Sequence, residues 1–160
     1  MARTYRDPQP RTFEDFALGD VILTRGRTLD TSDFTAFAGL TGDHYPLHID
    51  EEYASATRFG TRIGHGPLSF TIAVGLVGMT GYYGDGIVAL LEVQSLRALK
   101  PVMAGDTISV RAEVVGCDAG DNPKYGTLSV AYSVRNQRDE EIMQFTQVML
   151  AKRATAAQED

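Results

Sequence analysis

The 160-residue sequence predicts an α+β domain in which a curved antiparallel β-sheet wraps around one long central helix. Two observations support this prediction. Residues 67–79 have almost no polar face, and such a helix must be covered by other elements in a water-soluble protein. Residues 87–152 then alternate apolar and polar side chains with the two-residue period of β-strands.

The chain before the central helix is expected to hold short elements. Residues 21–25 predict a first strand, and helices are predicted over 34–40 and 51–58. Asp50 is the expected N-cap of the second helix, because a short polar side chain accepts hydrogen bonds from the free amides of the first turn. Pro67 fits the first position of the central helix, where an amide has no helical partner anyway.

Four long strands are expected after the central helix, over residues 87–99, 107–116, 125–135 and 141–152. Short polar loops join the last three, so these strands should pair antiparallel. Such a sheet leaves an unpaired edge, and joining two edges across a two-fold axis removes it. We therefore expect a homodimer or a dimer-based higher oligomer.

Polar sequences at both ends delimit the predicted domain. Residues 1–12 are expected to form an N-terminal extension and residues 153–160 a polar C-terminal tail, both frayed. The folded domain is expected over residues 13–152, because no linker, repeat or low-complexity block interrupts that span.

Charge and hydropathy argue against nucleic acids and membranes as binding partners. The chain has 15 Lys+Arg against 21 Asp+Glu, a net charge of −6, whereas nucleic-acid binding needs a basic face. The longest near-apolar stretch, residues 68–79, is shorter than the roughly 20 residues of a membrane span, and the N-terminus has no apolar signal core. We expect a cytoplasmic protein with no nucleic-acid or membrane partner. Cys117, the single cysteine, cannot form an intrachain disulfide and is expected to be buried on a strand.

The histidines lie close together in the sequence, at His44, His48 and His65. Asp43 and His48 flank Pro46, and a proline turn can bring the two side chains toward one point. A carboxylate beside an imidazole is a usable acid/base pair. The same spacing fits a turn-capping aspartate and a core histidine, so the residues alone leave both interpretations open.

A second feature lies at the start of the central helix. Gly66 precedes Pro67, which has no amide, so the free N–H at the positive end of the helix dipole belongs to Gly66. Such a donor stabilises the enolate oxygen that develops when a thioester is attacked at its β-carbon. The alternative is that the glycines only allow a tight turn before the helix.

Several short motifs surround these residues. They are Gly42-Asp43, Pro46-Leu47-His48-Ile49-Asp50, Phe59-Gly60 and Ile63-Gly64-His65-Gly66. Together they resemble the hydratase signature of the MaoC-like dehydratase family, which includes the (R)-specific enoyl-CoA hydratases. The resemblance extends over roughly residues 13–152, and it implies a single hot-dog domain, the fold of that family.

The resemblance implies an activity as well as a fold. Family members add water reversibly to a trans-2-enoyl-CoA and form an (R)-3-hydroxyacyl-CoA. Carried over, Asp43 and His48 hold and activate the water and pass its proton to Cα, while the Gly66 N–H lies in the oxyanion hole. The substrate carries CoA, so no separate cofactor is expected. No metal is expected either, because the histidine spacing matches no strong zinc pattern.

Two positions depart from the family pattern. Tyr45 stands where the family commonly has Asn, and it either contacts the substrate or packs on the loop. Val74 stands where many members have a serine in the central helix. His65 matches the histidine that precedes this helix, and we expect it to orient the Gly66 turn or to contact the substrate. His44 is expected to be exposed.

Two other functions stay open on the same fold. An acyl-CoA thioesterase would direct water at the carbonyl carbon, and a non-catalytic acyl-thioester-binding subunit would bind without turnover. In each case an acidic chain needs a local basic region for the CoA phosphates. The candidates are Arg58, Arg62, Arg97, Lys100 and Lys124.

Overall fold

The computed structural model describes residue 4 and residues 6–154. A 3-10 helix, η1, is followed by two short strands, four helices and four long strands. In chain order they are η1 (Phe13–Asp15), β1 (Val21–Leu23), β2 (Arg27–Thr28), α1 (Thr31–Thr41), α2 (Pro46–Ile49), α3 (Glu51–Ser55), α4 (Gly66–Gly78), β3 (Ile87–Ala98), β4 (Thr107–Asp118), β5 (Tyr125–Arg135) and β6 (Glu141–Lys152). The predicted α+β architecture is confirmed.

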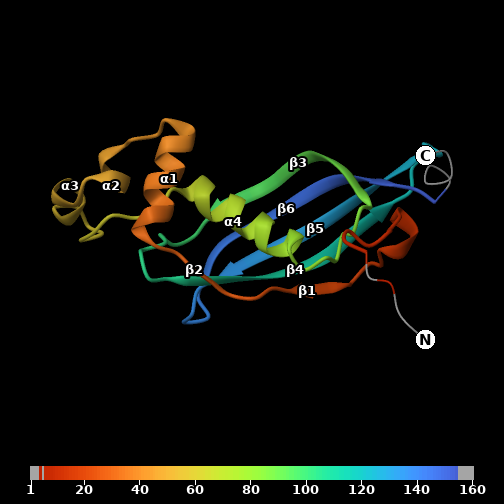
Figure 1. Cartoon of the computed structure of the whole chain (residues 1–160), viewed down its shortest axis with the longest axis horizontal. Helices are drawn as coiled ribbons and strands as arrows, with labels where there is room; N and C mark the ends of the chain where they lie inside the picture. Colours follow the sequence, from red (N-terminus) through yellow and green to blue (C-terminus); the bar gives the residue numbers. More distant parts are fainter. Residues whose placement is uncertain (1–3, 5, 155–160) are drawn as a thin grey trace.

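The sheet is antiparallel, with strand order β1-β4-β5-β6-β3, and β2 pairs separately with β4. The expected hairpins β4–β5 and β5–β6 form. Strand β3 pairs with β6 rather than with β4, the next strand in sequence. In Figure 1, α4 lies along one face of the sheet, and α1, α2 and α3 form a lobe beyond its N-terminal end. The ends of the described chain lie at the opposite end of the molecule.

The core lies between α4 and the sheet. The alternation predicted for β4 and β5 is confirmed, because the inward positions of both strands are buried. Against them pack the buried apolar residues of α4, which are Leu68, Ile72, Ala73, Leu76 and Val77. The expectation that α4 is covered on all sides is wrong for the single chain, since Thr71, Gly75 and Met79 are exposed. Cys117 lies on β4 as expected, but it too is exposed.

The polar ends are better attached than the sequence suggests. The Asp85 amide donates to the Gln9 carbonyl at 3.0 Å, and the Arg11 guanidinium donates to the Tyr82 carbonyl at 2.6 Å. At the other end, Arg153 donates to the Glu14 carboxylate at 3.1 Å. The expected fraying is therefore wrong for these residues. The rest of the predicted tail, residues 155–160, lies outside the described residues.

The lobe is made of short helices with well-defined ends. Asp30 and Asp33 form a capping box at the start of α1, and Gly42 ends the helix with φ 77°, a left-handed conformation that glycine adopts without strain. Asp50 caps α3 as predicted, by accepting from the Tyr53 amide at 3.1 Å. Helix α2, a single turn with Pro46 at its first position, was not predicted.

Gly64 joins the lobe to α4 at a point of close approach. Its amide donates to the Val102 carbonyl at 2.7 Å, and a Cβ at this position would lie 2.9 Å from a ring carbon of Phe34. Phe34 is fully buried, so its ring has little room to move. A side chain at residue 64 would therefore push the lobe away from α4.

We expect Gly64→Ala to lower the free energy of unfolding by about 1–3 kcal/mol, the usual cost of overpacking a core. Urea denaturation followed by circular dichroism measures this change. The matched control is Gly39→Ala in α1, where a Cβ meets nothing within 4 Å and Ala favours the helix. Equal stability of the two variants would contradict the proposed contact with Phe34.

Candidate active site

Asp43 and His48 lie on either side of the turn that links α1 to α2. The Asp43 carboxylate accepts from the Tyr45 amide at 3.2 Å, which holds the loop against its own side chain. His48 lies in α2, and its Nδ1 is 2.8 Å from the Ile63 carbonyl oxygen. A carbonyl oxygen only accepts, so Nδ1 carries the hydrogen and Nε2 is left with the free lone pair in the neutral ring.

His65 is the buried partner of this pair. Its side chain is 1% exposed, and its Nε2 lies 3.0 Å from the Asp43 carbonyl oxygen. By the same reasoning Nε2 carries the hydrogen. Within the described part of the chain, nothing bonds the buried Nδ1 of His65.

The three side chains meet at one place. One polar atom from each of Asp43, His48 and His65 lies within 4.8 Å of the others. The two imidazole rings stack with their centroids 3.8 Å apart and their planes at 27°. The Asp43 side chain is 55% exposed, so the cluster opens to solvent on the carboxylate side. The predicted convergence of Asp43 and His48 is present, and His65 joins it.

Gly66 is the first residue of α4, next to this cluster. It is exposed, and no described residue accepts a hydrogen bond from its amide. Pro67 has no amide, and the amides of Leu68 and Ser69 both donate to the His65 carbonyl. The positive end of the α4 dipole therefore presents the Gly66 N–H as its free backbone donor.

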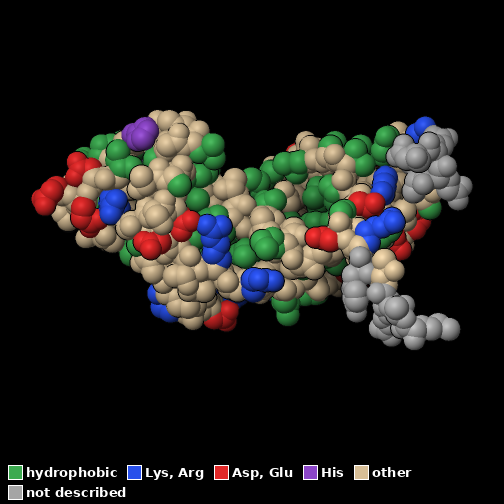
Figure 2. Space-filling view, viewed as in Figure 1, with side chains coloured by type: hydrophobic (Ala, Val, Ile, Leu, Met, Phe, Trp, Pro, Cys, Tyr) green, Lys and Arg blue, Asp and Glu red, His purple; other side chains and the backbone are tan. Residues whose placement is uncertain are grey.

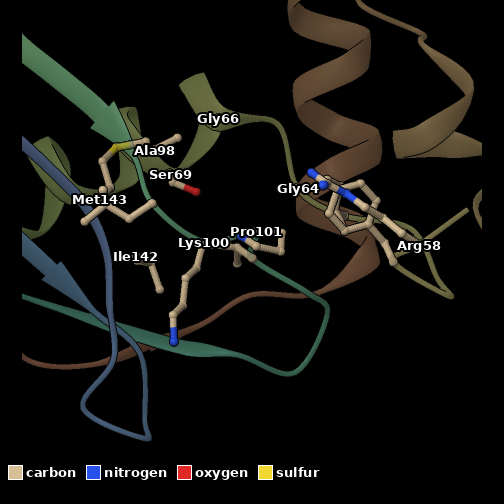
Figure 3. A pocket seen from close by; sticks show the side chains of 13 residues that line it. Arg58, Gly64, Gly66, Ser69, Ala98, Lys100, Pro101, Ile142 and Met143 are labelled. Atoms are coloured by element: carbon tan, nitrogen blue, oxygen red, sulfur yellow. The ribbon is translucent and has the colours of Figure 1, made fainter.

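A cavity of about 250 Å³ borders the same segment. Gly64 and Gly66 line one side of it, and the last residue of β3 and residues near the start of β6 line the other. Figure 3 shows Arg58 and Lys100 at different parts of its rim. The Lys100 ammonium pairs with Glu140 at 2.6 Å, and the Arg58 guanidinium lies 4.8 Å from the centre of the Phe59 ring. Asp43 and His48 are absent from the lining of this cavity.

Of the five basic candidates, the structure brings only Arg58 and Lys100 to this cavity. Arg62 pairs with Glu51 at 2.9 Å beside it. Arg97 lines a separate hollow on the sheet. Lys124 lies in the β4–β5 loop, where its carbonyl accepts from the Arg153 amide.

Tyr45 lies at the edge of the cluster and is 53% exposed. Its hydroxyl is 3.3 Å from that of Tyr53, and this hydrogen bond raises the pKa of Tyr53 above its ordinary value. The Tyr45 ring meets the His48 ring edge-on at 6.2 Å. His44 is exposed, as predicted.

A carboxylate and two imidazoles are also a donor set for a transition metal. Two of the four ring nitrogens are hydrogen donors to backbone carbonyls, and Nδ1 of His65 is buried. That leaves Asp43 and Nε2 of His48 as accessible ligands, fewer than a stable protein site uses. The arrangement suits a water between acid and base better than an ion.

Two features of the site escaped sequence reasoning. The Ile63 carbonyl, which orients His48, is a backbone atom and has no residue signature. Ser69, which lines the cavity beside Gly66, had one weak signal, since it is one of two hydroxyl-bearing residues, with Thr71, on a largely apolar helix.

The sheet, the helix it covers and the lobe at the helix N-terminus define a hot-dog protein. A Mycobacterium tuberculosis protein described as having a double hot-dog fold aligns over 90% of this chain and 44% of its own, with a TM-score of 0.78 and 21% identity. A structure titled monoamine oxidase regulatory protein, from Archaeoglobus fulgidus, aligns over 91% of this chain and 96% of its own, with a TM-score of 0.85 and 34% identity.

Residues 15–136 match the model of the MaoC like domain, so the chain belongs to the MaoC-like dehydratase family. It is 39% identical over 104 residues to an (R)-specific enoyl-CoA hydratase of Rhodospirillum rubrum, covering 65% of this chain and 69% of that protein. It is 38% identical over 104 residues to Protein MaoC of Klebsiella aerogenes, covering 65% of this chain. The match spans only 30% of that longer relative. No helix among the described residues is long and apolar enough to cross a membrane.

We expect nitrogen-15 NMR of the histidine rings to find opposite neutral tautomers, with hydrogen on Nδ1 of His48 and on Nε2 of His65. The two backbone carbonyls dictate this result, since each can only accept. Long-range proton–nitrogen correlation spectra above pH 8 measure it, with the exposed His44 as an internal reference. The same tautomer in His48 and His65 would contradict the geometry.

Proposed function

We propose that this protein catalyses the reversible hydration of a trans-2-enoyl-CoA to an (R)-3-hydroxyacyl-CoA. One observation carries the proposal: Asp43 and His48 converge beside the unpaired Gly66 amide at the start of a buried helix. The named activity of the Rhodospirillum relative, an (R)-specific enoyl-CoA hydratase, supports it. A dehydratase acting on 3-hydroxybutyryl-CoA in Methylorubrum extorquens is 36% identical over 102 residues.

The acid/base pair transfers one proton from the attacking water to the substrate. In hydration the water oxygen bonds to Cβ, and Asp43 and His48 together take a proton from that water and deliver one to Cα. A water molecule that bridges two polar atoms lies about 2.8 Å from each, and polar atoms of Asp43 and His48 lie within 4.8 Å of each other. No net proton is gained or lost, so the enzyme returns to its starting state.

The Gly66 N–H acts on the other end of the reacting system. As the new C–O bond forms at Cβ, negative charge moves through the conjugated chain to the thioester oxygen. A backbone amide at the positive end of α4 stabilises that charge without rearranging. All the chemistry then comes from side chains, an amide and the substrate itself, with CoA as the only carrier group.

The cavity gives the substrate a place beside these groups. Its apolar lining from Val102, Ile142 and Met143 suits an acyl chain or the thioester arm. Arg58 and Lys100 at the rim are the basic residues that we assign to the CoA phosphates. At the edge of the cluster, we assign Tyr45 to contact with the substrate. His65 orients the Gly66 turn from within the cluster.

The oligomer that we propose is a dimer built on strand β3. Among the described strands β6 is the only neighbour of β3, so its other edge is free. Leu90 and Leu91, at a register shift in β3, are both about half exposed. Figure 2 shows hydrophobic side chains gathered on the side of the molecule that carries β3. A second copy paired along this edge would cover these apolar side chains.

We expect Asp43→Asn and His48→Asn to lower kcat by roughly 100- to 10,000-fold, the usual contribution of a general acid or base. Each substitution keeps the local hydrogen bond. The amide oxygen of an asparagine at position 43 still accepts from the Tyr45 amide, and the side-chain amide of one at position 48 still donates to the Ile63 carbonyl. The measurement is loss of the enoyl-thioester absorbance with crotonyl-CoA and longer or dicarboxylic enoyl-CoAs.

The control is His44→Asn, an exposed histidine in the same loop, which should turn over as the wild type does. Thiol release from a saturated acyl-CoA is followed in parallel. Thiol release without loss of enoyl absorbance would replace the hydratase with a thioesterase, and binding without either reaction would indicate a non-catalytic subunit.

We expect Leu90→Lys to convert the dimer to single chains, because the two-fold axis brings like charges together along β3. Light scattering during size-exclusion chromatography measures the mass. Leu18→Lys, at an exposed position on the turn before β1, is the matched control and should leave the dimer intact. A wild-type protein with the mass of one chain would contradict the proposal.

A further inference from the structure

Ser69 is a buried hydroxyl that the chemistry above does not use. It lies on α4 one turn after Gly66, lines the same cavity and is 4% exposed. No described residue forms a hydrogen bond with its Oγ, although its amide is bonded to His65. Figure 3 shows the hydroxyl projecting from α4 into the space that the cavity-lining residues enclose.

The helix explains why this hydroxyl is free. A serine or threonine inside a helix ordinarily bonds to the carbonyl three or four residues earlier. Thr71, two residues further on, does so with the carbonyls of Pro67 and Leu68 at 3.0 and 2.9 Å. The corresponding carbonyls for Ser69 are those of His65, which already accepts two amides, and of Gly66. The Ser69 hydroxyl bonds to neither of them and points into the cavity.

Few backbone amides are free to donate at this end of α4. Pro67 has no amide, and the amides of Leu68 and Ser69 are bonded to His65, so Gly66 is the one free backbone donor among the first described residues of the helix. An enolate oxygen has lone pairs for two donors, and oxyanion holes are commonly built from two. The hydroxyl of Ser69 is a donor on the same helix, on the wall that Gly66 lines.

We infer that Ser69 is a catalytic residue that donates the second hydrogen bond to the thioester oxygen of the substrate, beside the Gly66 amide. The inference rests on the proposed hydratase function. Ser69 keeps its proton throughout and forms no covalent bond. The hydrogen bond from Ser69 becomes stronger when water adds to Cβ, because negative charge then reaches the thioester oxygen. The bond weakens again when Cα is protonated.

Isotope-edited infrared spectroscopy tests this contact without any turnover. The probe is butyryl-CoA labelled with carbon-13 at the thioester carbonyl, which has no double bond to hydrate. Two donors polarise the carbonyl and shift its band to lower frequency on binding, and we expect Ser69→Ala to lose a large part of that shift. Thr71→Ala removes a hydroxyl from the same helix outside the cavity and should keep the full shift.

Kinetics with an enoyl-CoA provides the second arm. We expect Ser69→Ala to lower kcat roughly 100-fold with a small change in KM, the pattern of a lost oxyanion donor. Thr71→Ala should match the wild type. An unchanged carbonyl band in Ser69→Ala, or no shift in the wild type, overturns the inference. A wild type that shifts the carbonyl but hydrates no enoyl-CoA contradicts the proposed function alone.

Discussion

The site depends on the contacts of one buried residue, His65. Its ring donates to the Asp43 carbonyl and stacks on His48, and its own carbonyl accepts the first amides of α4. The ring of His65 therefore connects the lobe to α4, and its carbonyl binds the helix amides that would otherwise compete with the Gly66 amide. Asp43, His48 and Gly66, the residues that we propose as acid/base pair and oxyanion donor, are held together because they share this neighbour.

The sequence predicts those parts of the fold that are governed by local periodicity. The alternation in β4 and β5 is confirmed, and the apolar run does form the helix α4, although one side of α4 is exposed in the single chain. The pairing of β3 with β6 depends on how a distant connection runs, which no local pattern encodes. Cys117 was misplaced as well, since it is exposed although Leu128, its partner on β5, is buried.

The candidate site was partly predictable on the same grounds. Asp43 and His48 flank a proline turn, so their convergence follows from the local sequence. The roles of His65 and Ser69 depend on a contact between residues far apart in the chain and on a carbonyl that is already occupied. Family resemblance marks the position of His65, but it cannot say which of its nitrogens is bonded or what it stacks against.

The two departures from the family pattern, Tyr45 and Val74, leave the convergence of Asp43 and His48 in place. Asp43 is held by the amide of residue 45, which any residue except proline supplies, so Tyr45 keeps that contact. Its ring turns outward to Tyr53, which changes the entrance rather than the acid/base pair. Val74 is half-buried in α4, more than a turn beyond Ser69. Ser69, which is closer to Gly66 than Val74 is, lines the cavity.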